Sequence, residues 1–406
     1  MKKRLTIGLL LLCLFLPLFV SCSCSRRIST PVAETNASSA EITTAAETEA
    51  CFFTVDNGVV TGVTGHFRQN ENAELVIPSA FNGLAISGIG AYAFAGCTNL
   101  ISITLPDSVT SIGSNAFSGC SNLSSLVIPD SVTSIGSNAF FGCSKLSSLV
   151  IPDSVTSIGA DAFSNCSGLR TLVIGNGVVS LPGGLLSGCS SLESITIPFV
   201  GDRTRTGNDA DQYPFGYLFG TNKYAGGVAT QQEFLCSDCI DGVITNTFYI
   251  PASLKSVTTF GEEILANAFS GCTSITSVTI GDSVKRIRDC AFSRCSGLAS
   301  VVIGNGVTRI DGGAFVECVG LSSVIIGNRV SIIGSSAFGE CTKLVSVTIP
   351  SSVTRIDGDA FGGCTNLTSF YFDGTKEQWA AVVKRPSWCV GAGVHAIICT
   401  NGTIPQ

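Results

Sequence analysis

The apolar positions of the chain recur in one pattern along most of its length. The segment SVTSIGSNAFSGCSNLSSLVIPD occupies residues 108–130, and SVTSIGSNAFFGCSKLSSLVIPD follows at 131–153 with two changes in 23 positions. Self-similarity at a fixed period of about 20 to 50 residues is typical of solenoids and related arrays. We therefore predict a stack of coils, each made of 23 residues.

One unit explains how such a stack holds together. The stretch LSSLVIP (123–129) predicts a short strand whose Leu123, Leu126 and Ile128 side chains point inward. A single unit cannot bury its apolar face, whereas stacked units bury a continuous core because equivalent side chains meet in neighbouring coils. We expect the strands to form one curved parallel β-sheet on the concave side, with short helical turns elsewhere in each coil.

Ten cysteines mark the period in two series with a spacing of 23 residues, separated by a gap of 83. They are Cys97, Cys120, Cys143, Cys166 and Cys189, then Cys272, Cys295, Cys318, Cys341 and Cys364. Each stands among apolar residues, where Cys is a good small buried side chain. A ladder of cross-coil disulfides would need the right Cβ directions at every step. We therefore expect buried free thiols and predict neither a metal site nor a cofactor.

The units resemble the leucine-rich repeats of the BspA-like bacterial surface protein family. Each is close to V-T-x-I-G-x-x-A-F-x-G-C-x-x-L-x-S-V-x-I-P-x-S, and the resemblance covers residues 75–370. It implies a leucine-rich repeat solenoid in an exported surface protein. It also implies adhesion to host matrix proteins or to other microbes as the expected function.

The two ends of a solenoid must cover the terminal core. In the predicted N-terminal cap, residues 51–74, the segment FFTVDNGVVTGVTG (52–65) with its Asn-Gly pair predicts a hairpin. The predicted C-terminal cap, residues 371–406, has apolar residues at helical spacing over 375–385. Its segment HAIICTNGT predicts a final hairpin, and this tail is similar to the caps of the family.

The N-terminal segment is an export signal rather than part of the fold. Three basic residues precede an apolar run over 5–20, as in a signal peptide, here residues 1–21. The stretch FVSC resembles a lipoprotein cleavage motif with Cys22 as the lipidated residue, although Phe19 stands where Leu is usual; the alternative is an ordinary cleaved signal. Residues 22–50 are rich in Ser, Thr, Ala and Glu and predict a disordered tether. We expect a membrane-anchored lipoprotein at the cell surface.

The repeat is broken in the middle, where we place two enlarged coils over 199–246, with insertions near 199–216 and 221–246 and a further coil strand at 247–251. In solenoids, insertions emerge on one face, and that face often binds ligands. Tyr213, Phe215 and Tyr217 are therefore candidate binding residues.

Four cysteines outside the series are candidates for disulfides. Cys236 and Cys239 form a C-x-x-C pair, but a zinc site would need a second pair with suitable spacing nearby. A local disulfide is the commoner outcome in an exported protein. Cys389 and Cys399 in the tail are the other two candidates.

Charge and outward strand positions limit the chemistry. Charged residues make up 13% of the chain and the net charge is −6, which argues against nucleic-acid binding. Outward strand positions are mostly Ser, Thr and Val, which offer no paired carboxylates and no nucleophile with a base. Arg170 and Glu193 are the clear charges on adjacent coils and are candidate binding residues. We therefore predict no enzyme.

The sequence thus predicts a monomeric scaffold that binds a protein or glycan of the host matrix or of other cells. Two alternatives stay open. One is a passive component of the cell envelope that has no specific ligand. The other is an exported hydrolase, which would need its acidic residues to lie in the central insertions.

Overall fold

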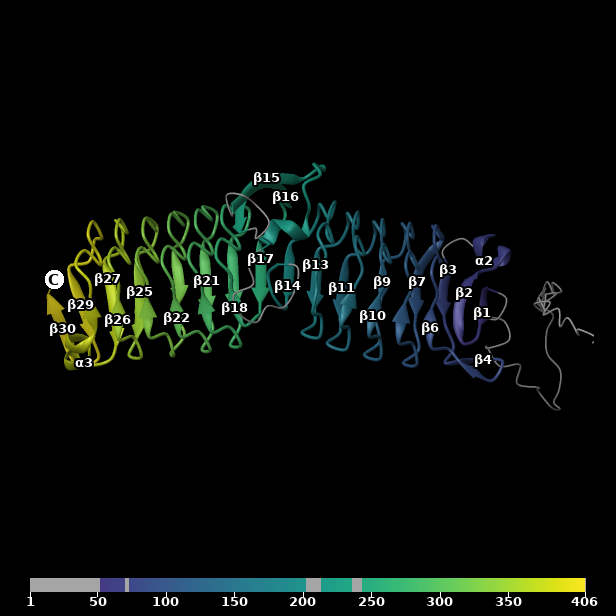
Figure 1. The fold of residues 1–406 in the computed structure, drawn as a ribbon, viewed down its shortest axis with the longest axis horizontal. Coiled ribbons are helices and arrows are strands. Elements are labelled where there is room, and N and C mark those ends of the chain that lie inside the picture. Colours follow the sequence, from purple (N-terminus) through teal and green to yellow (C-terminus); the bar gives the residue numbers. More distant parts are fainter. Residues whose placement is uncertain (1–51, 70–72, 202–212, 236–242, 406) are drawn as a thin grey trace, which may run out of the picture.

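The structure is a computed structural model that describes residues 52–69, 73–201, 213–235 and 243–405. The coils follow one another along the long axis of the molecule, from the purple N-terminal end to the yellow C-terminal end (Figure 1). Strand pairing between coils joins equivalent residues 23 positions apart, as in Ser148↔Thr171 and Ser277↔Ser300. The predicted leucine-rich repeat solenoid is confirmed.

Each regular coil contributes one strand to a main row, and alternate residues of these strands point into the core. They are called the longer strands, because all but the two-residue β9 have three to five residues. The longer strands are β3 (Ala73–Val76), β7 (Leu100–Thr104), β9 (Ser125–Leu126), β11 (Ser148–Ile151), β13 (Thr171–Ile174), β14 (Ser194–Ile197), β17 (Ser256–Thr259), β19 (Ser277–Ile280), β21 (Ser300–Ile303), β23 (Ser323–Ile325), β25 (Ser346–Pro350) and β27 (Ser369–Asp373). Their outward-facing side, with the residue that precedes each strand, is called the strand face below.

A second row of two-residue strands follows on another side of the coils. These short strands are β6 (Gly88–Ile89), β8 (Ser111–Ile112), β10 (Ser134–Ile135), β12 (Ser157–Ile158), β18 (Glu263–Ile264), β20 (Arg286–Ile287), β22 (Arg309–Ile310), β24 (Ile332–Ile333) and β26 (Arg355–Ile356). They pair in parallel in two separate sheets, one ending at β12 and one starting at β18. The central insertion lies between these two sheets.

Stacked phenylalanine rings form the centre of the core. Phe94, Phe117 and Phe140 lie with ring centroids 5.2 and 5.3 Å apart, and the second series from Phe269 to Phe361 has spacings of 4.8 to 5.3 Å. Such offset stacks add attraction to the burial of each ring. This column of stacked rings, the phenylalanine ladder, follows from the 23-residue period of the sequence.

The ten repeated cysteines are buried free thiols, as predicted. Most of them donate a hydrogen bond to a phenylalanine carbonyl oxygen of the preceding coil, for example Cys120 to Phe94 and Cys143 to Phe117, at 3.0 and 3.2 Å. Burial raises the pKa of Cys120 to about 12. These thiols therefore stay protonated at neutral pH and act as packing and hydrogen-bonding groups.

Each coil turns sharply just before its Ala-Phe pair. The residue at this place has a left-handed backbone, with φ of 57° at Asn115 and 54° at Asn138. Asn and Asp tolerate this conformation better than most residues because their short polar side chains bond locally. The turn chemistry explains why most coils carry Asn, Asp or Gly here.

The predicted N-terminal hairpin is present. β1 (Phe53–Asp56) and β2 (Val59–Val63) pair antiparallel around a turn in which Asn57 and Gly58 have φ of 48° and 77°. β2 then pairs in parallel with β6, and α2 (Gly65–Gln69) follows it. Next along the chain, β4 (Ala80–Phe81) and β5 (Leu84–Ala85) form a small second hairpin.

The C-terminal end closes the core with a helix and a hairpin. α3 (Lys376–Ala381) begins with a capping box between Thr375 and Gln378. It is shorter than the predicted span 375–385, because β28 (Val383–Lys384) pairs with β26 instead. The predicted final hairpin is present as β29 (Ala396–Cys399) and β30 (Gly402–Pro405).

The central insertion differs from the predicted layout. The longer strands β14, β17 and β19 are consecutive in one sheet, and their first residues, Ser194, Ser256 and Ser277, lie 62 and 21 positions apart. Both insertions thus belong to a single enlarged coil, and the next coil is short. The segment 247–251 does not form a coil strand but belongs to a projecting hairpin.

Candidate binding surface

The outward positions of the strand face carry Ser, Thr and β-branched apolar residues. Val127, Val150 and Ile325 are 77%, 60% and 60% exposed. Each alternates with inward core residues, as in β11, where the pattern is exposed, buried, exposed, buried. Contiguous exposed apolar surfaces are typical of sites where a protein contacts another molecule.

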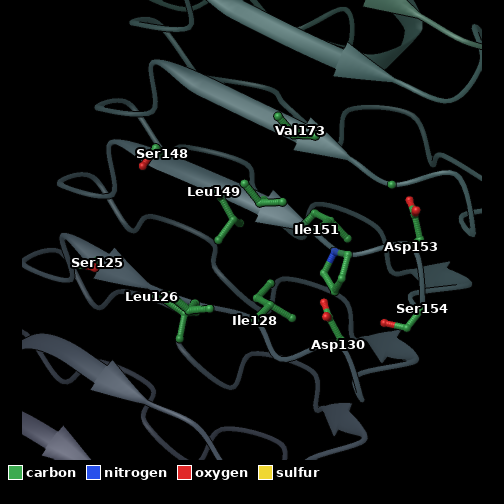
Figure 2. Close-up of a pocket in the computed structure, with 14 residues that line it drawn as sticks. Ser125, Leu126, Ile128, Asp130, Ser148, Leu149, Ile151, Asp153, Ser154 and Val173 are labelled. Carbon is green, nitrogen blue, oxygen red and sulfur yellow. The ribbon is translucent and has the colours of Figure 1, made fainter. Parts of the chain in front are cut away.

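The main sheet is interrupted at two places on this face, the first of them between β9 and β11. β9 pairs with β7, and β11 pairs with β13, but in the described part of the chain no pairing joins β9 to β11. A groove of about 730 Å³ lies there, lined by residues 125–128, 130, 148–154, 173 and 175 (Figure 2). A similar interruption separates β23 from β25.

The groove combines an apolar wall with acidic residues at the ends of the strands. Val127 and Val150 belong to the wall. Asp130 and Asp153 follow the two strands, as Figure 2 shows. The Asp153 carboxylate accepts a hydrogen bond of 2.7 Å from the backbone N–H of Asn176. The unpaired strand edges with an apolar wall suit an extended peptide, which can pair with backbone while its side chains contact the wall.

Arg170 and Glu193, both predicted as binding residues, form an ion pair across adjacent coils. Their side chains are 61% and 53% exposed, so the pair contributes little to stability. Lys255 lies beside Glu193 in the next coil, and its backbone N–H donates to the Glu193 carbonyl oxygen over 2.9 Å. The structure thus adds Lys255 to this charged row. Lys255 was not predicted from the sequence, because 62 positions instead of 23 separate it from Glu193, the equivalent residue of the preceding coil.

The predicted aromatic residues fall into two groups. Tyr213 and Tyr217 are half-buried with ring centroids 4.3 Å apart, and the Tyr217 ring packs over Gly183. Phe215 is fully buried in η1 (Phe215–Leu218), between the rings of Phe219 and Phe269. Its assignment as a contact residue is therefore corrected, because it continues the core where the regular phenylalanine ladder is broken.

A long hairpin rises from the enlarged coil (Figure 1). β15 (Gly227–Leu235) and β16 (Val243–Pro251) pair antiparallel over nine residues each. Gln232 joins it to the solenoid, because its side-chain oxygen accepts from the Gly216 N–H over 2.7 Å and its nitrogen donates to the Ser270 carbonyl oxygen over 3.0 Å. The hairpin is therefore held against the solenoid by a buried amide in the half of β15 nearer its tip.

The candidate disulfides have separate outcomes. Cys236 and Cys239 lie outside the described residues, as does Cys22, the predicted lipidation residue. Cys399 is a buried free thiol on β29, so no disulfide joins it to Cys389. Cys389 lies in a turn whose neighbours stack on residues 361 and 363, while β29 pairs with β27 on another side of the last coil. This separation is the physical reason that the predicted tail disulfide is absent.

Neither a metal-binding cluster nor a membrane-spanning helix occurs among the described residues. Among them, no group of three or more His, Cys, Asp or Glu side chains could hold a metal ion. No helix in the same part of the chain is long and apolar enough to cross a membrane.

Comparisons with known proteins agree with the repeat. A family model described as BspA type leucine rich repeat region matches residues 87–207 and 262–380 in six copies. The crystal structure of a leucine rich cell surface protein from Faecalibacterium prausnitzii is 28% identical over 87% of this chain and 98% of that chain, with a TM-score of 0.36. A leucine-rich repeat protein from Bacteroides ovatus is 25% identical over 79% of this chain and 83% of that one, with a TM-score of 0.33. No curated protein matches the chain.

Proposed function

Since the chain belongs to the BspA-type leucine-rich repeat family, we propose that it is a surface scaffold that binds another protein through its strand face. The observation that carries this proposal is the row of exposed apolar side chains next to the interrupted sheet, with Val127 at 77% exposure. Binding there uses contact area and backbone pairing, and it needs no reactive group.

We further propose where this scaffold acts. Export and lipidation at Cys22 would anchor the protein to a membrane, and the tether over 22–50 would hold the solenoid away from that membrane. The partners would then be proteins of a host matrix or of other cells, and each anchored monomer would present one strand face. The charged row with Arg170, Glu193 and Lys255 lies along the same face and would add specificity.

The test is binding of the full chain to immobilised matrix proteins and to surface extracts of other microbes, each before and after protease treatment. We expect saturable binding that protease treatment of the target abolishes. Binding that survives protease but is lost on glycosidase treatment would replace the protein partner with a glycan. Absence of binding by the folded chain would favour the passive component of the cell envelope. Turnover of a substrate in a hydrolase screen would favour the exported hydrolase.

A further inference from the structure

The row of short strands carries an unusual concentration of arginine in its C-terminal half. These arginines lie on or directly after β20, β22, β26 and β28, and they are Arg286, Arg288, Arg309, Arg355 and Arg385. The equivalent places in the N-terminal half hold small residues, such as Ser111 and Ser134 on β8 and β10. The coil itself therefore does not require arginine there. These five residues are called the arginine face below.

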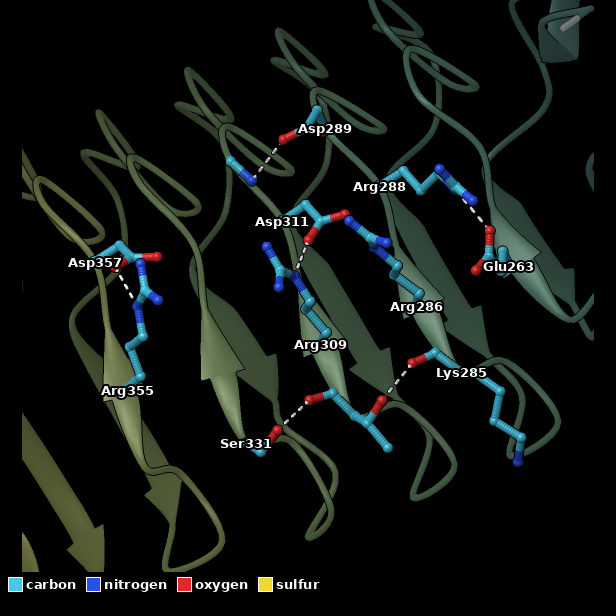
Figure 3. Close-up of polar contacts among 12 residues, drawn as sticks. Glu263, Lys285, Arg286, Arg288, Asp289, Arg309, Asp311, Ser331, Arg355 and Asp357 are labelled. Carbon is cyan, nitrogen blue, oxygen red and sulfur yellow. Dashed lines mark hydrogen bonds and ion pairs between the residues drawn. The ribbon is translucent and has the colours of Figure 1, made fainter. Parts of the chain in front are cut away.

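Buried carboxylates lie beside two pairs of these arginines. Figure 3 shows Asp311 with Arg286 and Arg309, and Asp357 with Arg355. Asp311 is 2% exposed, and its two oxygens accept from Nε of Arg286 and of Arg309. Asp357, which is 13% exposed, accepts from Nε of Arg355 over 2.7 Å, and Nε of Arg385 lies 3.9 Å away. Each carboxylate thus neutralises one of its two guanidinium groups.

Two further carboxylates, Glu263 and Asp289, lie near these arginines. Arg288 pairs with Glu263 over 2.6 Å. The hydrogen bond to Asp311 raises the pKa of Arg286, and the charges of Glu263 and Asp289 also help to raise it. The five arginines and these four carboxylates therefore leave a net charge of +1.

The contacts leave the outer edge of the guanidinium groups available. Arg309 and Arg355 use Nε for their carboxylates, and in the described part of the chain no protein acceptor bonds to their Nη atoms. A guanidinium has five N–H donors in a fixed fork that matches oxyanions bidentately. The buried carboxylates fix the plane of each guanidinium group, so the two Nη atoms of each group are already oriented before a ligand binds.

A row of hydroxyl groups directly precedes the short strands in these coils, and Figure 3 shows one of them, Ser331. Thr308, Ser331 and Thr354 donate to carbonyl oxygens of the preceding coils over 3.1, 2.9 and 3.2 Å. Their oxygens keep acceptor capacity for a hydroxyl-rich ligand. The exposed Lys285 adds a further positive charge at one end of the row.

We propose that the arginine face binds a linear sulfated polysaccharide that runs along the axis of the solenoid. Coils lie about 4.8 Å apart, so the four steps from Arg286 to Arg385 span about 19 Å. Two apolar side chains stand in this register, the half-buried Ile332 and Val383, which is 59% exposed, whereas the hydroxyl row accompanies the arginines and favours a hydroxyl-rich ligand over a peptide. The site lies on a different sheet from the strand face, so it does not depend on the protein-binding function proposed above.

The test is the affinity of the full chain for heparin, measured by titration calorimetry at several salt concentrations. The variant Arg309→Gln/Arg355→Gln removes two forks but leaves Arg286 with Asp311 and Arg385 with Asp357. We expect at least tenfold weaker binding and a smaller dependence on salt. The control Arg294→Gln/Lys343→Gln removes the same charge from exposed positions outside the arginine face, and it should bind as the unmodified chain does.

Three results would overturn the proposal. These are no binding of heparin by the folded chain at low salt, equal weakening in both double variants, and equal affinity for polyglutamate, which would indicate a site for acidic peptides. The variant Arg309→Lys/Arg355→Lys keeps the charge without the fork and should bind several-fold more weakly than the unmodified chain. Unchanged binding by this variant would contradict the role of the fixed guanidinium planes. Thermal unfolding of each variant checks that it is folded.

Discussion

The thiol of Cys143 donates a hydrogen bond of 3.2 Å to the carbonyl oxygen of Phe117, which lies in the preceding coil. The same contact joins Cys364 to Phe338 near the other end of the solenoid, at 3.0 Å. A thiolate has no proton to donate to this carbonyl oxygen, and burial would also deprive its negative charge of hydration. The repeated cysteine therefore links neighbouring coils only while it stays protonated.

The stability of the protein should consequently fall at alkaline pH. Burial raises the pKa of Cys166 and of Cys364 to about 12, whereas a thiol in the unfolded chain titrates near 8.5. Below that pH both states hold the proton; above it only the unfolded chain releases it. We predict a loss of about 1.4 kcal/mol per pH unit for each such thiol.

Urea unfolding between pH 7 and 9.5, under reducing conditions, measures this slope. The variant Cys143→Ala removes one of these groups and should show a slope smaller by the contribution of one thiol. A free energy of unfolding that stays constant or rises over this range would be incompatible with protonated buried thiols.

Two neighbouring phenylalanines allow the contribution of a buried ring to stability to be compared with that of an exposed ring. Phe140 is fully buried between Phe117 and Phe163, whereas Phe141 is 36% exposed. We predict that Phe140→Ala lowers the free energy of unfolding by about 3–5 kcal/mol. Phe141→Ala should cost about 1 kcal/mol or less. Denaturant unfolding of both variants checks the difference, and similar losses would show that the ring ladder is not the main core.

The buried carboxylate Asp311 should be important for stability. Replacing it with Ala leaves Arg286 and Arg309 without their shared partner. Because these two side chains are 35% and 45% exposed and can be solvated, we expect a loss of about 1.5–3 kcal/mol, as for hydrogen bonds to charged groups. The matched control is Glu317→Ala, which breaks the exposed pair with Arg294 and should cost less than about 1 kcal/mol. Thermal and urea unfolding measure both values, and an Asp311→Ala variant as stable as the control would refute the role assigned to this carboxylate.

Thr259 offers a stabilising substitution. It is fully buried at the inward position held by Ile197 and Ile280 in the neighbouring coils, and its hydroxyl is the one buried side-chain oxygen or nitrogen among the described residues with no hydrogen-bond partner. Thr259→Val keeps the shape and removes the unsatisfied group, so we expect a gain of about 1–2 kcal/mol. A loss of stability in urea unfolding would show that the hydroxyl has a role in the folded protein.

The regular part of the fold could be predicted from the sequence because one period sets every layer. Once Phe117 and Phe140 are seen to be 23 positions apart, stacking of coils brings their rings together, and the cysteines follow the same rule. The Asn57-Gly58 pair likewise predicted the capping turn through its own backbone preference.

The binding surface was less predictable because it depends on where the period fails. Segment 247–251 has the alternating pattern of a coil strand, and the same pattern serves the projecting hairpin. Phe215 was predicted to be a contact residue because it stands in an insertion, but its ring packs between those of Phe219 and Phe269 in the core. The units at 108–130 and 131–153 are nearly identical, so the pattern gave no sign that pairing is lost between β9 and β11.

The most direct test of the proposed function compares two pairs of valine substitutions in the full chain. Val127→Ser/Val150→Ser alters the strand face beside the groove, and Val179→Ser/Val319→Ser alters two exposed valines elsewhere on the coils. Affinity for the partner found in the binding panel is measured for both, with thermal unfolding as a check of folding. Binding through the strand face predicts at least tenfold weaker affinity for the first variant and an unchanged affinity for the second. Equal affinity of both variants would contradict binding at this surface.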